Sequence, residues 1–224
     1  MSTTLPQLKF SYFEIRGRGD AARIALHVGG IPFEDDRVTV EAWGALKPTT
    51  PFGQLPMLTI NGTIRIAQSN AVLLYVGALA GLYPVQDILK AALISQIVLQ
   101  IEDMNTAVDS NRQTQDINVK MSQRKHLAEV RYPAMFGALE KVIEEHSSGK
   151  WAVGDSISVA DVSIYILVLM IKSALWDGIP TDLVDPFARV QAVFEAVRTH
   201  PKVLEWETAH PNMKGFAIAT AASS

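Results

Sequence analysis

The sequence predicts an α/β domain with a mixed sheet, followed by an all-helical domain. Two observations lead to this fold class. Signals for strands and helices alternate through about the first eighty residues, and after Tyr83-Pro84 only helical periodicity remains. A chain of 224 residues with 48% apolar content can bury a substantial core. We therefore expect one domain over residues 1–83 and a second over residues 84–224.

The N-terminal half opens with a strand, a helix and a second strand. Residues 8–13 have a strand pattern, and a helix follows from Asp20 until Gly29-Gly30 ends it. A further extended run covers residues 33–40. Two strands joined by a helix of this length form a right-handed parallel unit.

A hairpin completes the predicted sheet. Residues 55–60 have a strand pattern, and Asn61-Gly62 is a strong signal for a tight turn into another strand. Hairpin strands are antiparallel, so the sheet is mixed. A last helix, from Ser69 to about residue 79, makes this a thioredoxin-like domain.

The second half has helical signals throughout. Ser158 and Asp161 are spaced so that each caps an orphan amide of the other, and Ile157 can pack on Val162. We interpret this capping box as folding information worth about 1 kcal/mol, and Asp161 is not expected to be catalytic. The predicted helices cover residues 87–110, 116–146, 158–175 and 184–199 and a short segment after Pro201.

Composition excludes several classes of function. A net charge of −3 with scattered Lys and Arg argues against nucleic acid or an anionic membrane as the main partner. Without cysteine there is no disulfide, thiolate metal site or cysteine nucleophile. Residues 1–7 do not resemble a signal peptide, and the longest apolar run, residues 162–171, is too short to span a membrane. A cytoplasmic protein is expected.

Pro56 marks the first half of a candidate binding site. It lies one residue into the predicted strand, where proline is tolerated only at an edge or an entry because it lacks a donor. If the Leu55-Pro56 bond is cis, the Leu55 amide and carbonyl face outward and can pair with an extended peptide. The alternative is an ordinary trans proline at the start of a strand.

The second half of the site is the helix that begins near Ser69. Its first amides have no partner inside the helix, and the helix dipole favours negative charge there. A carboxylate can therefore bind at this end. Alternatively, Ser69 is a plain N-cap that satisfies its own helix.

Taken together, these residues resemble the glutathione transferase family over nearly the whole chain, and within it the sigma-like branch. The resemblance implies glutathione as co-substrate, no metal, a small hydrophobic electrophile and a homodimer. It rests on residues 9–13 with 16–19, on Trp43 and Lys47, on residues 51–58, on Gln68-Ser69 and on residues 158–161.

The resemblance assigns Tyr12 as the residue that donates a hydrogen bond to the glutathione sulfur and Arg18 as its cationic neighbour. From the residues alone, Tyr12 could instead be a core residue, and Arg16 and Arg18 cannot be told apart. Ser11 is the competing hydroxyl, but adjacent strand residues point to opposite faces, so only one of the two reaches the sulfur.

The resemblance also assigns residues that hold the rest of glutathione. Trp43 and Lys47, one helical turn apart, would bind the glycine end, and Gln54 could join them, although lysine is common at its position. Alternatively, Trp43 is an ordinary half-buried tryptophan and Lys47 an ordinary surface lysine. The other predicted ligands are Leu55 and Pro56 at the strand edge, Gln68 and Ser69 for a carboxylate, and Asp103, or Glu102 after a one-residue slip, from the partner subunit of a dimer.

The resemblance thus predicts a glutathione transferase that conjugates the thiolate to small hydrophobic electrophiles, with a role in detoxification. A glutathione-dependent isomerase of the prostaglandin type is one alternative. The other is a non-catalytic member that keeps the fold for binding or structure.

Overall fold

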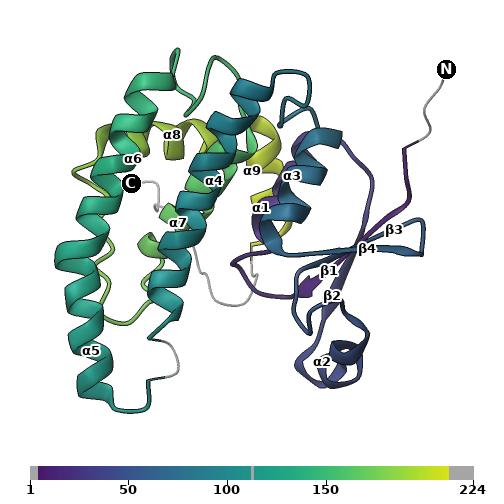
Figure 1. Cartoon of the computed structure of the whole chain (residues 1–224), viewed down its shortest axis with the longest axis horizontal. Coiled ribbons are helices and arrows are strands. Elements are labelled where there is room, and N and C mark those ends of the chain that lie inside the picture. Colours follow the sequence, from purple (N-terminus) through teal and green to yellow (C-terminus); the bar gives the residue numbers. More distant parts are fainter. Residues whose placement is uncertain (1–4, 112–113, 212–224) are drawn as a thin grey trace.

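A computed structural model describes residues 5–111 and 114–211. Figure 1 shows a sheet with α1 and α3 beside it, and a bundle formed by α4 and the later helices. Helix α1 (Asp20–Val28) packs on α3 (Ser69–Leu79) and also on the bundle helices α7 (Val159–Lys172) and α9 (Pro201–Ala209). It therefore lies where the two parts meet.

The sheet is mixed, as predicted. Strand β1 (Leu8–Phe13) pairs in parallel with β2 (Glu34–Val38) and antiparallel with β3 (Met57–Ile60), which pairs with β4 (Ile64–Ala67). The strand order is β2-β1-β3-β4. At the β3–β4 turn, Asn61 and Gly62 have φ of 50° and 71°. Positive φ at both central positions is the type I′ geometry that Asn-Gly favours.

The extended run predicted over residues 33–40 is shorter in the structure, because β2 ends at Val38 and a short helix follows. Helix α2 covers Val40–Leu46, and a 3-10 turn follows over Lys47–Thr49. Trp43 is therefore inside the helix, whereas Lys47 is its C-cap.

The helical half contains α4 (Ile88–Asp109), α5 (Ile117–His126), a π turn η2 (Leu127–Arg131), α6 (Tyr132–His146), α7, α8 (Ala188–Arg198) and α9. The predicted single helix over residues 116–146 is thus interrupted. Pro133 cannot donate to the carbonyl four residues earlier, and its ring clashes with that carbonyl. The helix widens into the π turn immediately before it.

Two helix ends predicted from the sequence are wrong. Helix α8 begins at Ala188 instead of residue 184, because Pro186 disfavours helical geometry in the residue before it. Helix α7 ends at Lys172 instead of residue 175, and Ala174 has φ of 60°, which breaks the helix. Among the described residues, none of the helices is long and apolar enough to cross a lipid bilayer.

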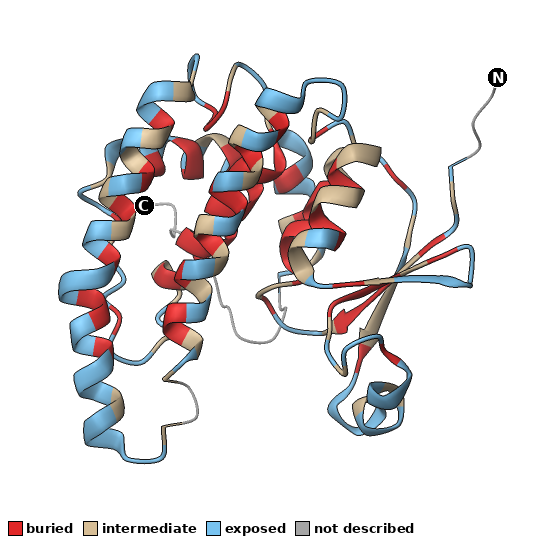
Figure 2. Cartoon of the chain, in the orientation of Figure 1, coloured by how far each residue is buried: buried red, intermediate tan, exposed pale blue. Residues whose placement is uncertain are grey.

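Helix α7 is the centre of the core. All but two of its residues are buried, and Figure 2 shows burial concentrated on this helix and on the inner faces of α1 and α4. The predicted capping box is present at its start. The Asp161 carboxylate accepts three hydrogen bonds, from Ala152 N–H (2.6 Å), Ser158 N–H (2.8 Å) and Ser158 O–H (2.7 Å).

We predict that Asp161→Ala lowers the free energy of unfolding by about 3 kcal/mol, since it orphans buried donors that each cost about 1–3 kcal/mol. Ser158→Ala should cost about 1 kcal/mol. Urea titration of the folded protein measures both. Asp155→Ala is the control, because that side chain is 85% exposed. Equal midpoints for Asp161→Ala and Asp155→Ala would contradict the role of the box.

Candidate functional site

A cavity of about 900 Å³ lies between the sheet domain and the C-terminal end of α4. The groups from the sheet domain come from the end of β1 and the turn after it, from α2, from the loop before β3 and from the start of α3. Those from the bundle come from α4 and the residue after it. The lining residues are Phe13, Arg18, Trp43, Gly53, Gln54, Leu55, Pro56, Gln68, Ser69 and Asn70 on one side, and Glu102, Thr106, Asp109 and Ser110 on the other.

The Leu55-Pro56 peptide bond is cis, which confirms the first of the two readings of Pro56. Strand β3 begins directly after it, at Met57. Within the described ranges, neither the N–H nor the C=O of Leu55 has a hydrogen-bond partner. The backbone of Leu55 at the cavity wall can therefore pair with an extended peptide.

Helix α3 points its N-terminus into the same cavity. Its N-cap is Gln68, with φ of 74°, and Ser69 is the first helical residue, so the alternative that Ser69 is a plain N-cap is wrong. In the part of the chain that the structure describes, the Ser69 hydroxyl makes no hydrogen bond. Both Ser69 and the first amides of the helix are available to a carboxylate.

Gln54 and Gln68 meet across the cavity wall. The Gln68 side-chain amide donates to the Gln54 side-chain oxygen at 3.4 Å, and both residues line the cavity. This contact places the strand edge and the helix start side by side.

Trp43 and Lys47 are placed differently. Trp43 is half-buried, lines the cavity and packs edge-on against Phe13, with ring centroids 5.7 Å apart. Lys47 is exposed and does not line the cavity, but a Cβ placed on Gly53 would lie 3.6 Å from its Cε. The ammonium is therefore near the rim.

Ser11 and Tyr12 point to opposite faces of β1, as expected. The Ser11 hydroxyl donates to Asp36 on β2 at 2.7 Å, which removes it from the site. Tyr12 is 7% exposed and is not among the lining residues of the cavity. Burial, and then the Asp20 carboxylate, raise the pKa of Tyr12 to about 12, while Arg18 opposes the rise through its charge and a backbone hydrogen bond. The phenol is protonated at neutral pH.

The turn at residues 17–19 fits closely around the Tyr12 ring. A Cβ on Gly19 would lie 2.3 Å from Tyr12 Cδ1, and one on Gly17 would lie 3.1 Å from the hydroxyl. The Gly17 N–H donates to the fully buried Asp20 carboxylate at 3.0 Å. The turn therefore has space only for glycine against Tyr12.

The structure distinguishes Arg16 from Arg18. The Arg18 side chain lines the cavity and bonds two carboxylates of α4: Nη2 to Glu102 at 2.8 Å, and Nη1 to Asp109. Arg16 is 5% exposed and forms a two-bond pair with Glu207 of α9, including Nη1 to Oε1 at 2.7 Å. Arg16 thus holds the two domains together, and Arg18 is the arginine of the site.

Glu102 and Asp103 are also separated. Glu102 lines the cavity of its own chain and bonds Arg18, whereas Asp103 is exposed on α4 and does not line it. A carboxylate that reaches another subunit would have to be the exposed one.

Sequence reasoning missed Thr106, Asp109 and Ser110 of α4, and considered Glu102 only as the alternative to Asp103. Glu102, Thr106, Asp109 and Ser110 follow the spacing i, i+4, i+7, i+8, which puts them on one helix face. This spacing is visible in the sequence. Phe13, Gly53 and Asn70 adjoin predicted residues and carried no separate signal.

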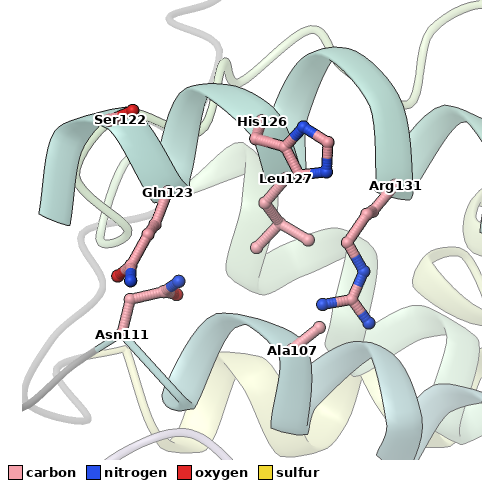
Figure 3. A pocket seen from close by; sticks show the side chains of 7 residues that line it. All are labelled: Ala107, Asn111, Ser122, Gln123, His126, Leu127 and Arg131. Carbon is pink, nitrogen blue, oxygen red and sulfur yellow. The ribbon is translucent and has the colours of Figure 1, made fainter. Parts of the chain in front are cut away.

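Two further hollows contain none of the predicted site residues. One of about 420 Å³ lies between the end of α4 and the α5–η2 segment, where Figure 3 shows Asn111 and Gln123 facing each other and His126 and Arg131 farther along. Another, of about 410 Å³, runs beside β2. Across residues 5–111 and 114–211 there is no group of three His, Asp or Glu side chains that could hold a metal.

Known proteins match this chain over both parts. Family models described as the glutathione S-transferase N-terminal and C-terminal domains match residues 8–78 and 102–210. A glutathione S-transferase 1 of Ascaris suum is 34% identical over 92% of this chain and 98% of its own. The hematopoietic prostaglandin D synthase of Gallus gallus is 30% identical over 92% of this chain and 98% of its own.

Solved structures agree. The glutathione S-transferase from Ascaris lumbricoides superposes with a TM-score of 0.75 at 33% identity, covering 94% of this chain and all of that one. A prostaglandin synthase D of Nilaparvata lugens gives a TM-score of 0.80 at 26% identity, covering 91% and 98%.

A thioredoxin-like domain thus presents the Leu55 edge and the α3 N-terminus to one cavity, and α4 of the helical bundle closes that cavity. The chain belongs to the glutathione S-transferase family. It is a glutathione transferase, which conjugates glutathione to electrophiles.

The fit between Gly19 and Tyr12 generates a prediction. Gly19→Ala must displace the Tyr12 ring, so we expect about 1–3 kcal/mol of destabilisation and a fall in turnover of roughly 10- to 100-fold. Gly137→Ala on α6 is the control, because a Cβ there meets nothing within 4 Å. Steady-state kinetics and thermal melts measure both variants. Full turnover in Gly19→Ala would contradict a role for the ring position.

Proposed function

We propose that the cavity binds glutathione as an extended peptide along the Leu55 edge. The observation that carries this is the convergence of an unpaired Leu55 backbone and the α3 N-terminus on one cavity. Gln68 and Ser69 hold the γ-glutamyl carboxylate. Trp43, Lys47 and Gln54 hold the glycine end, and Pro56 fixes the turn of the edge.

Tyr12 is proposed to donate a hydrogen bond to the sulfur, with Arg18 as a nearby cation. Support comes from the raised pKa of Tyr12, which keeps the phenol a donor, and from the Arg18 turn that contacts its ring. A thiol with a pKa near 8.5 is only a few per cent ionised at neutral pH. One hydrogen bond to an anion, worth about 1.5–3 kcal/mol, lowers that pKa by roughly one to two units.

The chemistry that follows is nucleophilic attack. The thiol proton passes to solvent, the thiolate forms a carbon–sulfur bond with the electrophile, and the leaving group departs with its bonding pair. The thiolate of a more acidic thiol is a weaker nucleophile, so ionisation gives only a modest gain in rate. Positioning of the second substrate supplies much of the remaining acceleration.

We predict that Tyr12→Phe leaves glutathione affinity almost unchanged, raises the thiol pKa in the binary complex by roughly one to two units and lowers turnover. Ultraviolet absorbance of the thiolate against pH gives the ionisation. Tyr83→Phe is the control, since its hydroxyl contacts Ser95 outside the cavity. An unchanged thiol pKa in Tyr12→Phe would refute the assignment.

Ser69 and Ser158 give a reciprocal prediction. Ser69→Ala should raise the glutathione KM with little change in stability, because its hydroxyl caps no helix. Gln68→Ala should raise the KM as well. Ser158→Ala should lose stability at unchanged KM, because its hydroxyl belongs to the capping box. Identical glutathione affinity in wild type and Ser69→Ala would rule out the carboxylate role.

A homodimer is proposed to complete the site, with Asp103 of one subunit contacting the γ-glutamyl ammonium in the other. Asp103 is exposed and Glu102 is occupied by Arg18, which favours Asp103 over its neighbour. Asp103→Asn should weaken glutathione binding without moving the thiol pKa, and dilution below the dimer constant should also lose binding. Calorimetry with analytical ultracentrifugation tests this. A fully active monomer would contradict it.

The proposal has further parts. The chain belongs to the sigma-like branch, and its domains divide at residues 83/84. It acts on small hydrophobic electrophiles, with a role in detoxification and a cytoplasmic location. A prostaglandin-type isomerase is the second candidate, favoured by the 30% identical prostaglandin D synthase. Turnover of an electrophile panel and of isomerisable endoperoxides, with glutathione supplied and withheld, separates the two. Absence of turnover with all of these substrates would indicate a non-catalytic role.

A further inference from the structure

The lining that glutathione leaves uncovered determines what the second substrate meets. If Trp43, Gln54, Leu55, Pro56, Gln68 and Ser69 hold glutathione as proposed, the rest of the lining is largely Phe13 on the sheet side and the α4 face on the other. That face consists of Glu102, Thr106, Asp109 and Ser110. No apolar side chain of α4 lines this cavity.

We propose, resting on the function above, that the enzyme selects uncharged or cationic electrophiles that carry a hydrogen-bond donor, and disfavours anionic ones. The selecting residues are Glu102 and Asp109. Phe13 receives the apolar part of the substrate, and α4 receives its polar substituent.

The charge of the α4 face supports this selection. Among the described residues of the lining, Arg18 is the one cation and is shared between Glu102 and Asp109, so the formal sum of these three charges is −1. Although burial acts to lower it, hydrogen bonds to these carboxylates raise the pKa of the Arg18 guanidinium, which stays charged. The three side chains are 33%, 29% and 36% exposed, so their charges act on the cavity. An anion placed there also faces the glutathione thiolate.

The hydroxyls of this face offer acceptors. The Thr106 hydroxyl donates a hydrogen bond to the Glu102 carboxylate at 3.3 Å, and the Ser110 hydroxyl donates one to the Ala107 carbonyl at 2.9 Å. Their donor capacity is used, and lone pairs remain on both oxygens. Together with the carboxylate oxygens, these hydroxyl oxygens can accept hydrogen bonds from a substrate. A substrate that has only hydrogen-bond acceptors makes no hydrogen bond with them.

Two apolar alternatives for the second substrate are less suitable or lie elsewhere. A hollow of about 30 Å³ adjoins the cavity and shares Arg18, Ser69, Asn70 and Glu102 with it. Its lining also includes Leu73, Val98, Ile101 and Ile166, but it has room for little more than water. The hollow beside β2, with Ile15, Val38 and Val40, lies on another side of Phe13 and excludes α4. An electrophile bound there would not sense Glu102 or Asp109.

Three electrophiles of matched shape test the inference: 4-chloro-3-nitrobenzamide, its methyl ester analogue methyl 4-chloro-3-nitrobenzoate, and 4-chloro-3-nitrobenzoate. In each, sulfur bonds to the ring carbon that carries chlorine, and chloride leaves with the bonding pair. Each kcat/KM is divided by the rate with free glutathione, which removes intrinsic reactivity. We expect the order amide, ester, anion, with the amide preferred over the anion by about tenfold, the scale of one net charge at this range.

Asp109→Asn and Glu102→Gln each remove one charge with little change of shape, and either should reduce the amide-to-anion ratio at least about threefold. Glu129→Gln is the control, because Glu129 lies on η2 outside the cavity and should leave the ratio unchanged. Conjugation of the ester by wild type checks the proposed function separately. The inference would be overturned if wild type used the amide and the anion equally well. It would also be overturned if the amide-to-anion ratio stayed the same in both variants, or changed as much in the control as in the variants.

Discussion

The contact of Arg18 with Glu102 and Asp109 is the interaction on which the geometry of the site depends. Arg18 lies in the turn after β1, and both carboxylates lie on α4, so the contact fixes one wall of the cavity relative to the other. A partly exposed ion pair contributes little free energy. Its value here is positional, because a guanidinium that bonds two carboxylates holds a defined orientation.

The same turn is fixed on its inner side by buried charge. Asp20 accepts the Gly17 N–H, and burial raises the pKa of the Asp20 carboxyl to about 6, opposed by the charges of Arg16 and Arg23. Arg23 in turn bonds Asp35 on β2 at 2.8 Å. The turn that surrounds Tyr12 is therefore tied to the sheet by Arg23, to α9 by Arg16 and to α4 by Arg18.

Local chemistry decided which features could be predicted from the sequence. Asn61-Gly62 and the Ser158–Asp161 spacing each specify one backbone geometry, and both predictions are confirmed. The alternative that Ser69 is an N-cap is wrong, because residue preferences do not fix the start of a helix to within one residue. The partner of Arg16 was unpredictable, since Glu207 lies 191 residues away. The α4 face was readable from its spacing, but only tertiary structure shows that it meets a cavity.

The distance between Arg16 and Glu207 also has a consequence for synthesis on the ribosome. The N-terminal domain emerges long before α9, and at about 5–20 residues per second the 191 intervening residues take roughly 10–40 s. During that interval Glu207 has not yet been made, whereas Asp20, whose charge also acts on Arg16, is already present. The pair between Arg16 and Glu207 can therefore form only after α9 has been synthesised.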